Sequence, residues 1–519
     1  MDREVLRAVA DHHWNGKPLS GVTEDSRRVR PGMVFVARRG RQVDGHLFLS
    51  AARQAGAALT VGEYRLSPDS PDILVSDGGK ALAELVSAWY GDPGRNLTLV
   101  GITGTNGKTT TAYLTASILA ASGRAVGTIG TLGYRFAEEI EEPSHTTPPP
   151  ETLYRLLHDW GENGATHIVM EASAQALAQG RTAACPFRVA ALTNITRDHG
   201  EYFRTMDSYR RAKRVMFTEL GRDATAVLPS DDPEARPFVA AIAAPTLYYG
   251  DGGMVTATEH GDPTLDGTAM VLSINGRGHH VFLPLPGLYN IRNALCASAA
   301  AHALGIPDLA IVEGLEKAEP VVGRTVVFET PAGVRAVIDY AHNPAGLVSV
   351  LRLLRGTTLG RLCVVMGARG HRDKGKRPLM GAVIAALADE LVLTSDRPLS
   401  EDPAQAAKPM LTAAQACGLP TRFVRDRAQA IAEVALTMEP RDCLLVSGKG
   451  SEPWLGDSAA GPITDLQALR ACLPDLALRQ IPGASKARRR GIAHAQALDA
   501  AMRDARPMPH DSAAGGLRH

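Results

Sequence analysis

The segment from Gly101 to Thr110 reads GITGTNGKTT, so it places glycines, a lysine and adjacent threonines at one bend of the chain. The apolar residues Leu97 to Val100 before it predict a buried strand, and Thr111 to Ser122 after it has the alanine and leucine content of a helix. The bend therefore faces the N-terminus of a helix, where backbone N–H groups and the helix dipole favour an anion. This arrangement predicts a loop that binds phosphate groups.

Four residues of this loop have the types that nucleoside triphosphate chemistry requires. Gly104 and Gly107 let backbone N–H groups approach phosphate oxygens without a Cβ in the way. Lys108 would reach the terminal phosphates, and the Thr109 hydroxyl would bind a magnesium ion. The general phosphate-loop pattern requires glycine where Ile102 stands, so the sequence GTNGKT is a specific variant of that pattern.

A second acidic group is needed to hold magnesium beside such a loop, and Glu171 has a suitable position. It follows the predicted strand His167 to Met170, and ligands of parallel sheets collect at the carboxyl ends of strands. His199 follows another predicted strand, and Lys213 falls within a predicted helix. Taken singly, each of these residues is more often structural than functional, so their roles depend on the motifs around them.

Length and composition restrict the class of protein. A chain of 519 residues predicts about three domains, at the usual ~100–200 residues each. The net charge of +1 gives no sign of a nucleic-acid-binding surface. The N-terminal segment lacks the apolar core of a secretion signal, and no apolar run approaches the ~18–20 residues that cross a bilayer. We therefore expect a cytoplasmic monomer that contacts neither membrane nor nucleic acid, with its six cysteines reduced and buried.

The order of predicted elements indicates an α/β protein. From Leu97 onward short apolar strands alternate with alanine-rich helical stretches, and a second such series begins near Gly323. The turn-rich residues Gly91 to Gly94 mark the first boundary, and the composition changes again past Pro482. The expected units are residues 1–96, 97–322 and 323–482, followed by a basic, partly disordered tail at 483–519.

Several motifs together resemble the Mur ligases, and among them the MurE type. They are GTNGKTT, the MEAS of Met170 to Ser173, the Thr193–His199 segment with its TN and RDH, AKRVMF, DYAHNP at Asp339 to Pro344, and RDKGKRP at Arg372 to Pro378. The resemblance runs in order from residue 25 to about residue 470. It implies three domains: an N-terminal domain for the uridine nucleotide, a central phosphate-loop ATPase with a parallel sheet, and a C-terminal Rossmann-like domain for the incoming amino acid.

The resemblance also implies a reaction. A substrate carboxylate takes the γ-phosphoryl group of ATP, an amine attacks the acyl phosphate, and phosphate leaves, with ATP and Mg²⁺ required. Such a transfer needs positive charge beside the phosphoryl oxygens, which Lys108 and magnesium would supply. The expected partners are small molecules, namely a UDP-N-acetylmuramoyl peptide or an analogue and an amino acid. The reaction would then be a step of peptidoglycan and cell-wall synthesis.

Roles for individual residues follow from the same motifs. The resemblance implies that Thr109, Glu171, His199 and Lys213 bind metal, with Lys213 carbamylated, and that Lys108, Lys213, His199 and Glu171 form the catalytic set. It implies ATP contacts from Gly104, Thr105, Asn106, Gly107, Lys108, Thr109, Thr110, Asn290, Asn293, Arg324, Asp339 and His342. It implies acceptor contacts from Ser26, Thr146, Thr147, Ser173 and Arg181, and amino-acid contacts from Arg372, Asp396, Arg397, Gly448 and Glu452.

The loop that selects the amino acid departs from the family. Diaminopimelate-adding members read DNPR there, and the arginine binds the distal carboxylate in bidentate fashion. This chain reads Asp396-Arg397-Pro398-Leu399, so the gripping arginine has become leucine. A buried distal carboxylate left unpaired would cost on the order of 2–4 kcal/mol, unless Arg397 replaces the lost partner. The GKGHE, SSH and DHLDYHGT segments also differ here, while the ATP and metal residues are kept.

Three interpretations remain open from the sequence. The first is a MurE-type ligase that adds an amino acid to a UDP-muramoyl peptide. The second is a ligase of a specialised pathway that joins an amino acid to a carboxylate outside peptidoglycan. The third is a regulatory module that holds ATP without turnover, and retention of Lys108, Thr109, Glu171, His199 and Lys213 speaks against it.

Overall fold

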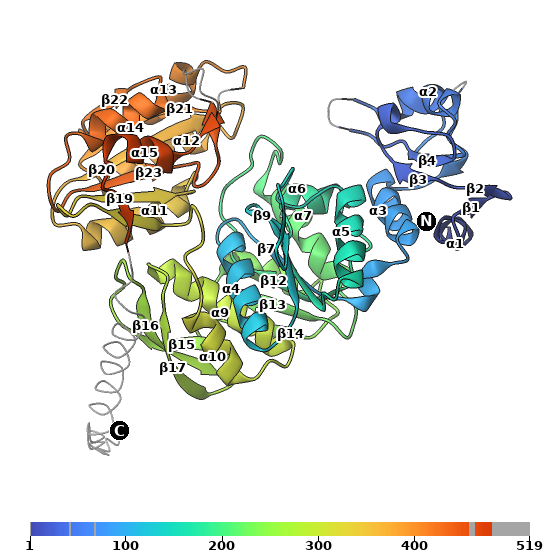
Figure 1. Ribbon diagram of the computed structural model, residues 1–519, viewed down its shortest axis with the longest axis horizontal. Coiled ribbons are helices and arrows are strands. Elements are labelled where there is room, and N and C mark those ends of the chain that lie inside the picture. The colour runs from blue at the N-terminus through green and yellow to red at the C-terminus, as the bar shows by residue number, and fades with distance from the viewer. Residues whose placement is uncertain (1, 41–42, 67–68, 398, 456–461, 480–519) are drawn as a thin grey trace, which may run out of the picture.

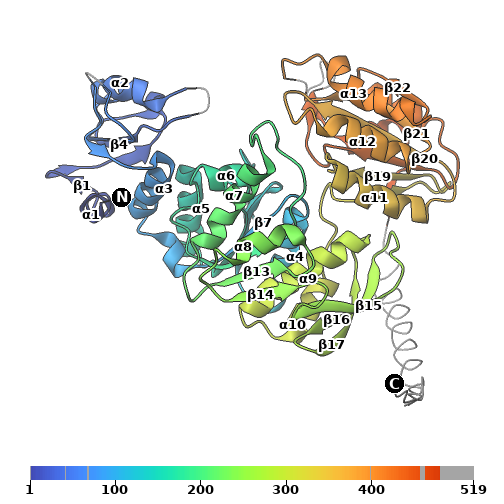
Figure 2. The ribbon, with the colours of Figure 1, turned by 180° about the vertical axis from the view of Figure 1, so that it is seen from behind.

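A computed structural model describes residues 2–40, 43–66, 69–397, 399–455 and 462–479. The chain forms successive units arranged in an elongated row, from the blue N-terminal unit through the green central unit to the orange C-terminal unit (Figures 1 and 2). The predicted tail, residues 483–519, lies outside the described residues. Within the described part of the chain, no helix is long and apolar enough to span a bilayer.

The N-terminal unit is built on a four-stranded parallel sheet in the order β3-β4-β5-β6. Its helices are α1 (Arg3–Ala10), α2 (Leu49–Gln54) and α3 (Gly78–Trp89), and its strands are β1 (His13–Trp14), β2 (Lys17–Pro18), β3 (Gly21–Thr23), β4 (Met33–Val36), β5 (Leu59–Gly62) and β6 (Ile73–Leu74). Helix α3 packs against α1 and β3 of its own unit and against α5 (Pro150–Glu162) of the central unit, so the two units share one apolar core.

The central unit has an eleven-stranded sheet in the order β10-β9-β8-β11-β7-β12-β13-β14-β15-β16-β17. Its strands are β7 (Thr98–Thr103), β8 (Val126–Gly130), β9 (Gly133–Phe136), β10 (Glu139–Glu141), β11 (His167–Glu171), β12 (Phe187–Leu192), β13 (Thr225–Pro229), β14 (Thr246–Tyr249), β15 (Val255–His260), β16 (Thr268–Ile274) and β17 (Arg277–Leu283). Its helices are α4 (Lys108–Ala121), α5 (Pro150–Glu162), α6 (Ala174–Ala178), α7 (Met206–Thr218), α8 (Arg236–Val239), α9 (Leu288–Ala303) and α10 (Asp308–Glu316).

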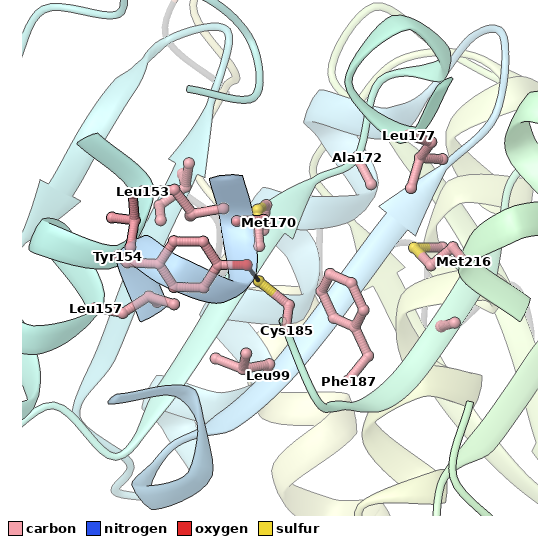
Figure 3. Packing of buried hydrophobic residues seen from close by; sticks show 14 of the residues in the cluster. Leu99, Leu153, Tyr154, Leu157, Met170, Ala172, Leu177, Cys185, Phe187 and Met216 are labelled. Carbon is pink, nitrogen blue, oxygen red and sulfur yellow. Dashed lines mark hydrogen bonds between the residues drawn. The ribbon is translucent and has the colours of Figure 1, made fainter. Parts of the chain in front are cut away.

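Helices cover both faces of this sheet, as the sequence predicts. Residues of α5 and α7 contribute to the apolar core on one face, and residues of α4, α9 and α10 contribute to the core on the other face. Figure 3 shows the first core, in which Tyr154 on α5 lies beside Leu99 of β7 and Met170 of β11. The buried Cys185 thiol donates to the Tyr154 hydroxyl over 3.7 Å.

The edges of the central sheet are antiparallel, which the sequence analysis did not anticipate. Strands β9 and β10 pair antiparallel at one edge, and β15, β16 and β17 pair antiparallel at the other. The β16–β17 hairpin turns at Asn275-Gly276, and both residues have positive φ angles, of 50° and 78°. Asn-Gly between alternating apolar residues is a strong signal for such a two-residue turn, so the sequence contained this information.

The C-terminal unit is a seven-stranded sheet in the order β22-β21-β20-β23-β19-β18-β26, with β18 and β26 antiparallel at one edge. The strands of this sheet are β18 (Val326–Glu329), β19 (Arg335–Asp339), β20 (Leu362–Arg369), β21 (Glu390–Asp396), β22 (Thr421–Phe423), β23 (Cys443–Ser447) and β26 (Ala477–Leu478). Strands β24 (Trp454–Leu455) and β25 (Pro462–Ile463) pair with each other in a separate two-stranded sheet. The helices of the unit are α11 (Pro344–Thr357), α12 (Lys376–Ala385), α13 (Pro403–Ala416), α14 (Arg427–Ala435) and α15 (Asp465–Cys472). The loops after β19, β20, β21 and β23 all leave the same edge of this sheet, because these strands are parallel.

All six cysteines are free thiols, but the prediction that they are buried is wrong for two of them. Cys417 is exposed and Cys472 is partly exposed. Both lie at the C-terminal ends of helices that present only one face to the core, so the last turn of each helix reaches solvent.

Candidate active site

The phosphate loop connects β7 to α4, and its glycines are required by close contacts. Gly104 has a φ of 145°, and a Cβ built there would lie 1.9 Å from the Thr193 hydroxyl oxygen. Gly107 has a φ of 84°, and its Cβ would lie 2.2 Å from Oδ1 of Asn293. Neither position accepts a side chain, because both the backbone angle and the space exclude it. The loop is therefore held close to the chain segments that surround it.

Replacement of Gly104 by alanine tests this tight placement. We expect ATP binding to weaken at least about tenfold, because the new methyl group must displace Thr193 and distort the loop. Gly356→Ala is the matched control, since nothing lies within 4 Å of a Cβ at Gly356. Equilibrium titration with a fluorescent ATP analogue measures both variants, and unchanged affinity in Gly104→Ala would contradict the assignment of this loop.

Two lysine side chains converge on one carbonyl oxygen of the loop. Lys108 Nζ donates to the carbonyl oxygens of Gly104 and Thr105, over 3.0 Å and 2.9 Å. Lys213 on α7 is buried, and its Nζ donates to the same Gly104 oxygen over 2.6 Å. Burial and the nearby Lys108 charge lower the pKa of Lys213 well below its usual value, which favours the uncharged form of this amine. Burial likewise lowers the pKa of Lys108, although Glu171 and Asp198 oppose that shift.

The predicted metal residues Thr109 and Glu171 are in direct contact. Thr109 Oγ1 donates to Glu171 Oε2 over 2.8 Å, and the backbone N–H of Thr131 donates to Glu171 Oε1 over 2.8 Å. Arg324 donates to Thr109 Oγ1 over 3.1 Å. A hydroxyl beside a buried carboxylate at the start of α4 is a donor set that suits a hard cation such as Mg²⁺.

His199 and Lys213 both lie near the aromatic ring of Tyr209. His199 has a φ of 57°, and its Nδ1 lies 3.5 Å from a carboxylate oxygen of Glu201. The Tyr209 ring connects the two residues, because its centroid lies 6.0 Å from the His199 ring and 4.6 Å from Lys213 Nζ. The described residues contain no cluster of three or more His, Cys, Asp or Glu side chains that would form a metal site by themselves.

A cleft of about 1050 Å³ lies between the central and C-terminal units. The sequence-predicted residues that line it are Thr105, Asn106, Gly107, Lys108, Thr109, Thr110, Thr146, Glu171, Ser173, Arg181, His199, Asn290, Asn293, Arg324, Asp339, His342, Arg372, Arg397 and Glu452. The cleft thus joins the phosphate loop to the loops that follow β19, β20 and β23.

The two sides of the cleft are connected by polar contacts that the sequence analysis did not assign. Asp198 accepts from Lys376 Nζ over 2.9 Å and from the Asn343 amide over 3.1 Å. Asn343 also exchanges two hydrogen bonds with Asn106 of the phosphate loop, over 2.8 Å and 3.2 Å. Each of these residues belongs to a motif noted in the sequence, but only the fold brings them together. The position of the C-terminal unit is therefore coupled directly to the phosphate loop.

His342 and Asp339 support this side of the cleft. His342 Nε2 lies 3.4 Å from Asp198 Oδ2. Burial alone would raise the pKa of Asp198, but the His342 contact and the charge of Lys376 outweigh it and hold the pKa well below its usual value. Asp339 accepts from the backbone and hydroxyl of Thr325 over 2.7 Å and 2.8 Å. Asp198 is thus the anion that organises the cations between the units.

The residues predicted for the acceptor substrate fall in two places. Thr147 is buried, donates to the Glu171 carbonyl oxygen over 2.7 Å, and does not line the cleft. Arg181 lines the cleft and donates to the Thr147 carbonyl oxygen over 2.7 Å. Ser26 lies on a short 3₁₀ turn of the N-terminal unit, away from the cleft. Its predicted contact would require a substrate long enough to reach from the cleft to the N-terminal unit.

The residues predicted to contact the amino acid also fall into two groups, those that line the cleft and those that do not. Arg372, Arg397 and Glu452 line the cleft, whereas Asp396 and Gly448 do not. Asp396 is buried with Oδ1 2.9 Å from Lys449 Nζ, so its carboxylate is directed into the protein. Leu399 is 66% exposed, and Pro398 lies outside the described residues.

Asn290 and Asn293 are hydrogen-bonded to each other next to the phosphate loop. Asn293 Nδ2 donates to Asn290 Oδ1 over 2.9 Å, and Asn290 Nδ2 donates to the Pro286 carbonyl oxygen over 2.8 Å. Both side chains are buried on helix α9, and Asn293 lies beside Gly107 of the phosphate loop.

Comparison with known proteins identifies the family. The model described as "Mur ligase family, catalytic domain" matches residues 18–90, the "Mur ligase middle domain" matches residues 102–301, and the "Mur ligase, glutamate ligase domain" matches residues 323–450. The UDP-N-acetylmuramoyl-L-alanyl-D-glutamate–2,6-diaminopimelate ligase of Bacillus licheniformis is 37% identical over 443 residues, covering 84% of this chain and 90% of the relative. The ligase of the same name from Chlorobaculum tepidum is 37% identical over 480 residues, covering 88% and 93%.

Solved structures agree with this relationship. A structure of a UDP-N-acetylmuramoyl-L-alanyl-D-glutamate–2,6-diaminopimelate ligase is 29% identical, with a TM-score of 0.63, and the match covers 89% of this chain and 96% of that one. The MurF ligase of Thermotoga maritima in complex with ADP shares the fold at 20% identity, with a TM-score of 0.59, over 91% of this chain and 98% of that one. The predicted α/β architecture of three Mur ligase domains is confirmed, and the chain belongs to the Mur ligase family.

Proposed function

We propose that this protein is an ATP-dependent ligase that adds an amino acid to the carboxylate of a UDP-N-acetylmuramoyl peptide. The observation that carries the proposal is the cleft, in which Lys108 and the Thr109–Glu171 pair face loops of the C-terminal unit. The diaminopimelate ligases that are 37% identical over most of the chain support the acceptor and the type of bond.

The proposed reaction proceeds in two transfers. The acceptor carboxylate attacks the γ-phosphorus of ATP, the bond to ADP breaks, and an acyl phosphate forms. The uncharged amine of the amino acid then attacks the acyl carbon, phosphate leaves with the electron pair of the C–O bond, and the nitrogen releases a proton to solvent as the amide forms. Lys108 is the residue that stabilises negative charge on the transferring group, because its ammonium lies at the start of α4 beside the loop carbonyl groups.

Thr109 and Glu171 would hold a magnesium ion, which supplies positive charge that neutralises phosphate oxygens. Lys213 enters the proposal as a carbamate. An uncharged buried amine reacts with carbon dioxide to give a carbamate and a proton, and the lowered pKa of Lys213 favours that amine form. The product is an oxygen donor, and with His199 it would extend the ligand set for hard cations.

The three units then have distinct proposed roles. Residues 1–96 bind the uridine end of the acceptor through Ser26, residues 97–322 bind ATP, and residues 323–482 bind the amino acid. Thr146, Ser173 and Arg181 line the cleft and contact the peptide end of the acceptor, while the buried Thr147 supports Arg181 through its carbonyl oxygen. Asn290, Asn293, Arg324, Asp339 and His342 contact ATP. The enzyme would act as a cytoplasmic monomer in peptidoglycan synthesis.

The test is release of phosphate from ATP and Mg²⁺ in the presence of UDP-N-acetylmuramoyl dipeptide and a panel of amino acids. We expect release that depends on both the acceptor and one amino acid, with equal amounts of ADP and amide product by mass spectrometry. Absence of release with every amino acid would contradict the muramoyl acceptor.

A second candidate is a ligase of the same chemistry that acts on a carboxylate outside peptidoglycan. The altered loop around Arg397 and the exposed Leu399 favour it, because they stand where diaminopimelate-adding members bind the distal carboxylate. Phosphate release with simple carboxylic acids, and none with the muramoyl dipeptide, distinguishes it from the first candidate.

A further inference from the structure

Arg369 is a cation in the amino-acid part of the cleft that no motif assigns. It is the last residue of β20 and lines the cleft together with Arg372, Arg397 and Glu452. Its side chain is only 15% exposed, so its charge must be compensated within the protein. The contacts of its guanidinium therefore show which groups in the cleft remain available to a ligand.

The principal partner of Arg369 is Glu452. Arg369 Nη2 lies 2.5 Å from Glu452 Oε2, and the Tyr340 hydroxyl donates to Glu452 Oε1 over 2.7 Å. Both carboxylate oxygens of Glu452 are thus bound by this chain. A carboxylate on a cleft wall is the natural site for a ligand ammonium, but here the guanidinium already occupies it.

Further contacts hold Arg369 in place. Its Nε lies 3.6 Å from a carboxylate oxygen of the buried Asp396, and its guanidinium carbon lies 5.4 Å from the centre of the Tyr340 ring. The Gly448 carbonyl oxygen accepts from Nη2 over 3.4 Å. An ammonium that displaced Arg369 from Glu452 would have to break these contacts as well.

The other charged side chains in the amino-acid part of the cleft favour an anionic ligand over a cationic one. Arg372 is paired with Glu201 over 2.6 Å, and Lys376 is paired with Asp198 over 2.9 Å. Arg397 is exposed on the cleft and has no ion-pair partner within the part of the chain that the structure describes. The cation left to meet a ligand is therefore Arg397, and among the described residues of this part of the cleft no carboxylate is left to meet a second ammonium.

We propose that Arg369 is a specificity-determining residue, which occupies Glu452 and so excludes amino acids that carry a second ammonium group. The inference rests on the proposed ligase function and names the class of its amino acid, one with a neutral or acidic side chain. Lysine and diaminopimelate are excluded because the carboxylate that would bind their distal ammonium, Glu452, is already paired with Arg369.

The test compares kcat/KM for phosphate release with glutamine, glutamate, lysine and diaminopimelate, using ATP, Mg²⁺ and UDP-N-acetylmuramoyl dipeptide. In the wild type we expect lysine and diaminopimelate to fall at least about tenfold below the better of glutamine and glutamate. Arg369→Ala should raise the lysine-to-glutamine ratio at least about tenfold, because Glu452 becomes free. Adding Glu452→Gln to that variant should abolish the gain, since the amide carries no charge.

Two further variants serve as controls for the effect of Arg369 on the lysine-to-glutamine ratio. Arg355→Ala removes a guanidinium that pairs with Asp389 over 2.7 Å outside the cleft, so it should leave the ratio unchanged. Arg369→Met retains side-chain volume and should reproduce the ratio of Arg369→Ala if the alanine variant unfolds. A wild type that uses lysine or diaminopimelate best, or an Arg369→Met ratio equal to that of the wild type, overturns the inference and leaves the ligase function standing. Absence of phosphate release with every amino acid contradicts both.

Discussion

Replacing Lys108 with alanine is expected to lower the rate of phosphate release at least about 100-fold while the protein stays folded. The ammonium lies within 3.0 Å of the loop carbonyl oxygens of Gly104 and Thr105, where it would meet the terminal phosphates of ATP. Alanine retains the helix and removes the ammonium that stabilises the transferring group, together with its hydrogen bonds to the loop. Single-turnover phosphate release at saturating ATP measures the effect on the chemical step.

The matched control is Lys317→Ala. Lys317 is 67% exposed and pairs with Glu313 one helical turn away, so its removal should change the rate by less than about twofold. Thermal unfolding of both variants separates loss of chemistry from loss of fold. A Lys108→Ala enzyme with a rate within about threefold of wild type would exclude this lysine from the transfer step.

The sequence predicted the central elements well, because their patterns are local. The strand before the phosphate loop and the helix after it were both expected, although α4 begins at Lys108 and not at Thr111. A lysine and two threonines have no special preference for a first helical turn, so composition alone placed the start one turn late. The loop itself was recognisable because Gly104 and Gly107 serve a backbone geometry that other residues cannot adopt.

The contacts between the units could not be predicted, because they depend on how separate segments meet. Asp198 and Lys376 lie 178 positions apart in the sequence and 2.9 Å apart in space. Each was visible within a motif, but neither motif indicates its partner. Nothing in the sequence indicated a role for Arg369, because an arginine at the end of a strand is common and its two carboxylate neighbours are known only from the fold. The identity of the chemistry was therefore accessible from sequence, whereas the selection of the amino acid required the fold.

Replacing Lys213 with alanine is expected to lower phosphate release at least about 100-fold, with partial recovery in acetate or formate. Lys213 is buried, its pKa is lowered well below the usual value, and its Nζ lies 2.6 Å from the Gly104 carbonyl oxygen. A carbamate at this position would supply oxygen ligands to a cation, and a small carboxylate diffusing into the space would replace them in part. Phosphate release at increasing acetate concentration measures the rescue.

Several comparisons make the Lys213 result specific to a carbamate. Lys213→Arg retains a cation that does not react with carbon dioxide, so it should be as inactive as Lys213→Ala and should gain nothing from acetate. Removal of dissolved carbon dioxide should lower wild-type activity reversibly, and ¹³C-labelled bicarbonate should give one carbamate resonance that the variants lack. ATP binding and thermal unfolding establish that each variant is folded, because a buried lysine also fills space. Near wild-type activity in folded Lys213→Ala would remove Lys213 from the site, and recovery by acetate without a carbamate resonance would assign the lysine a positioning role instead.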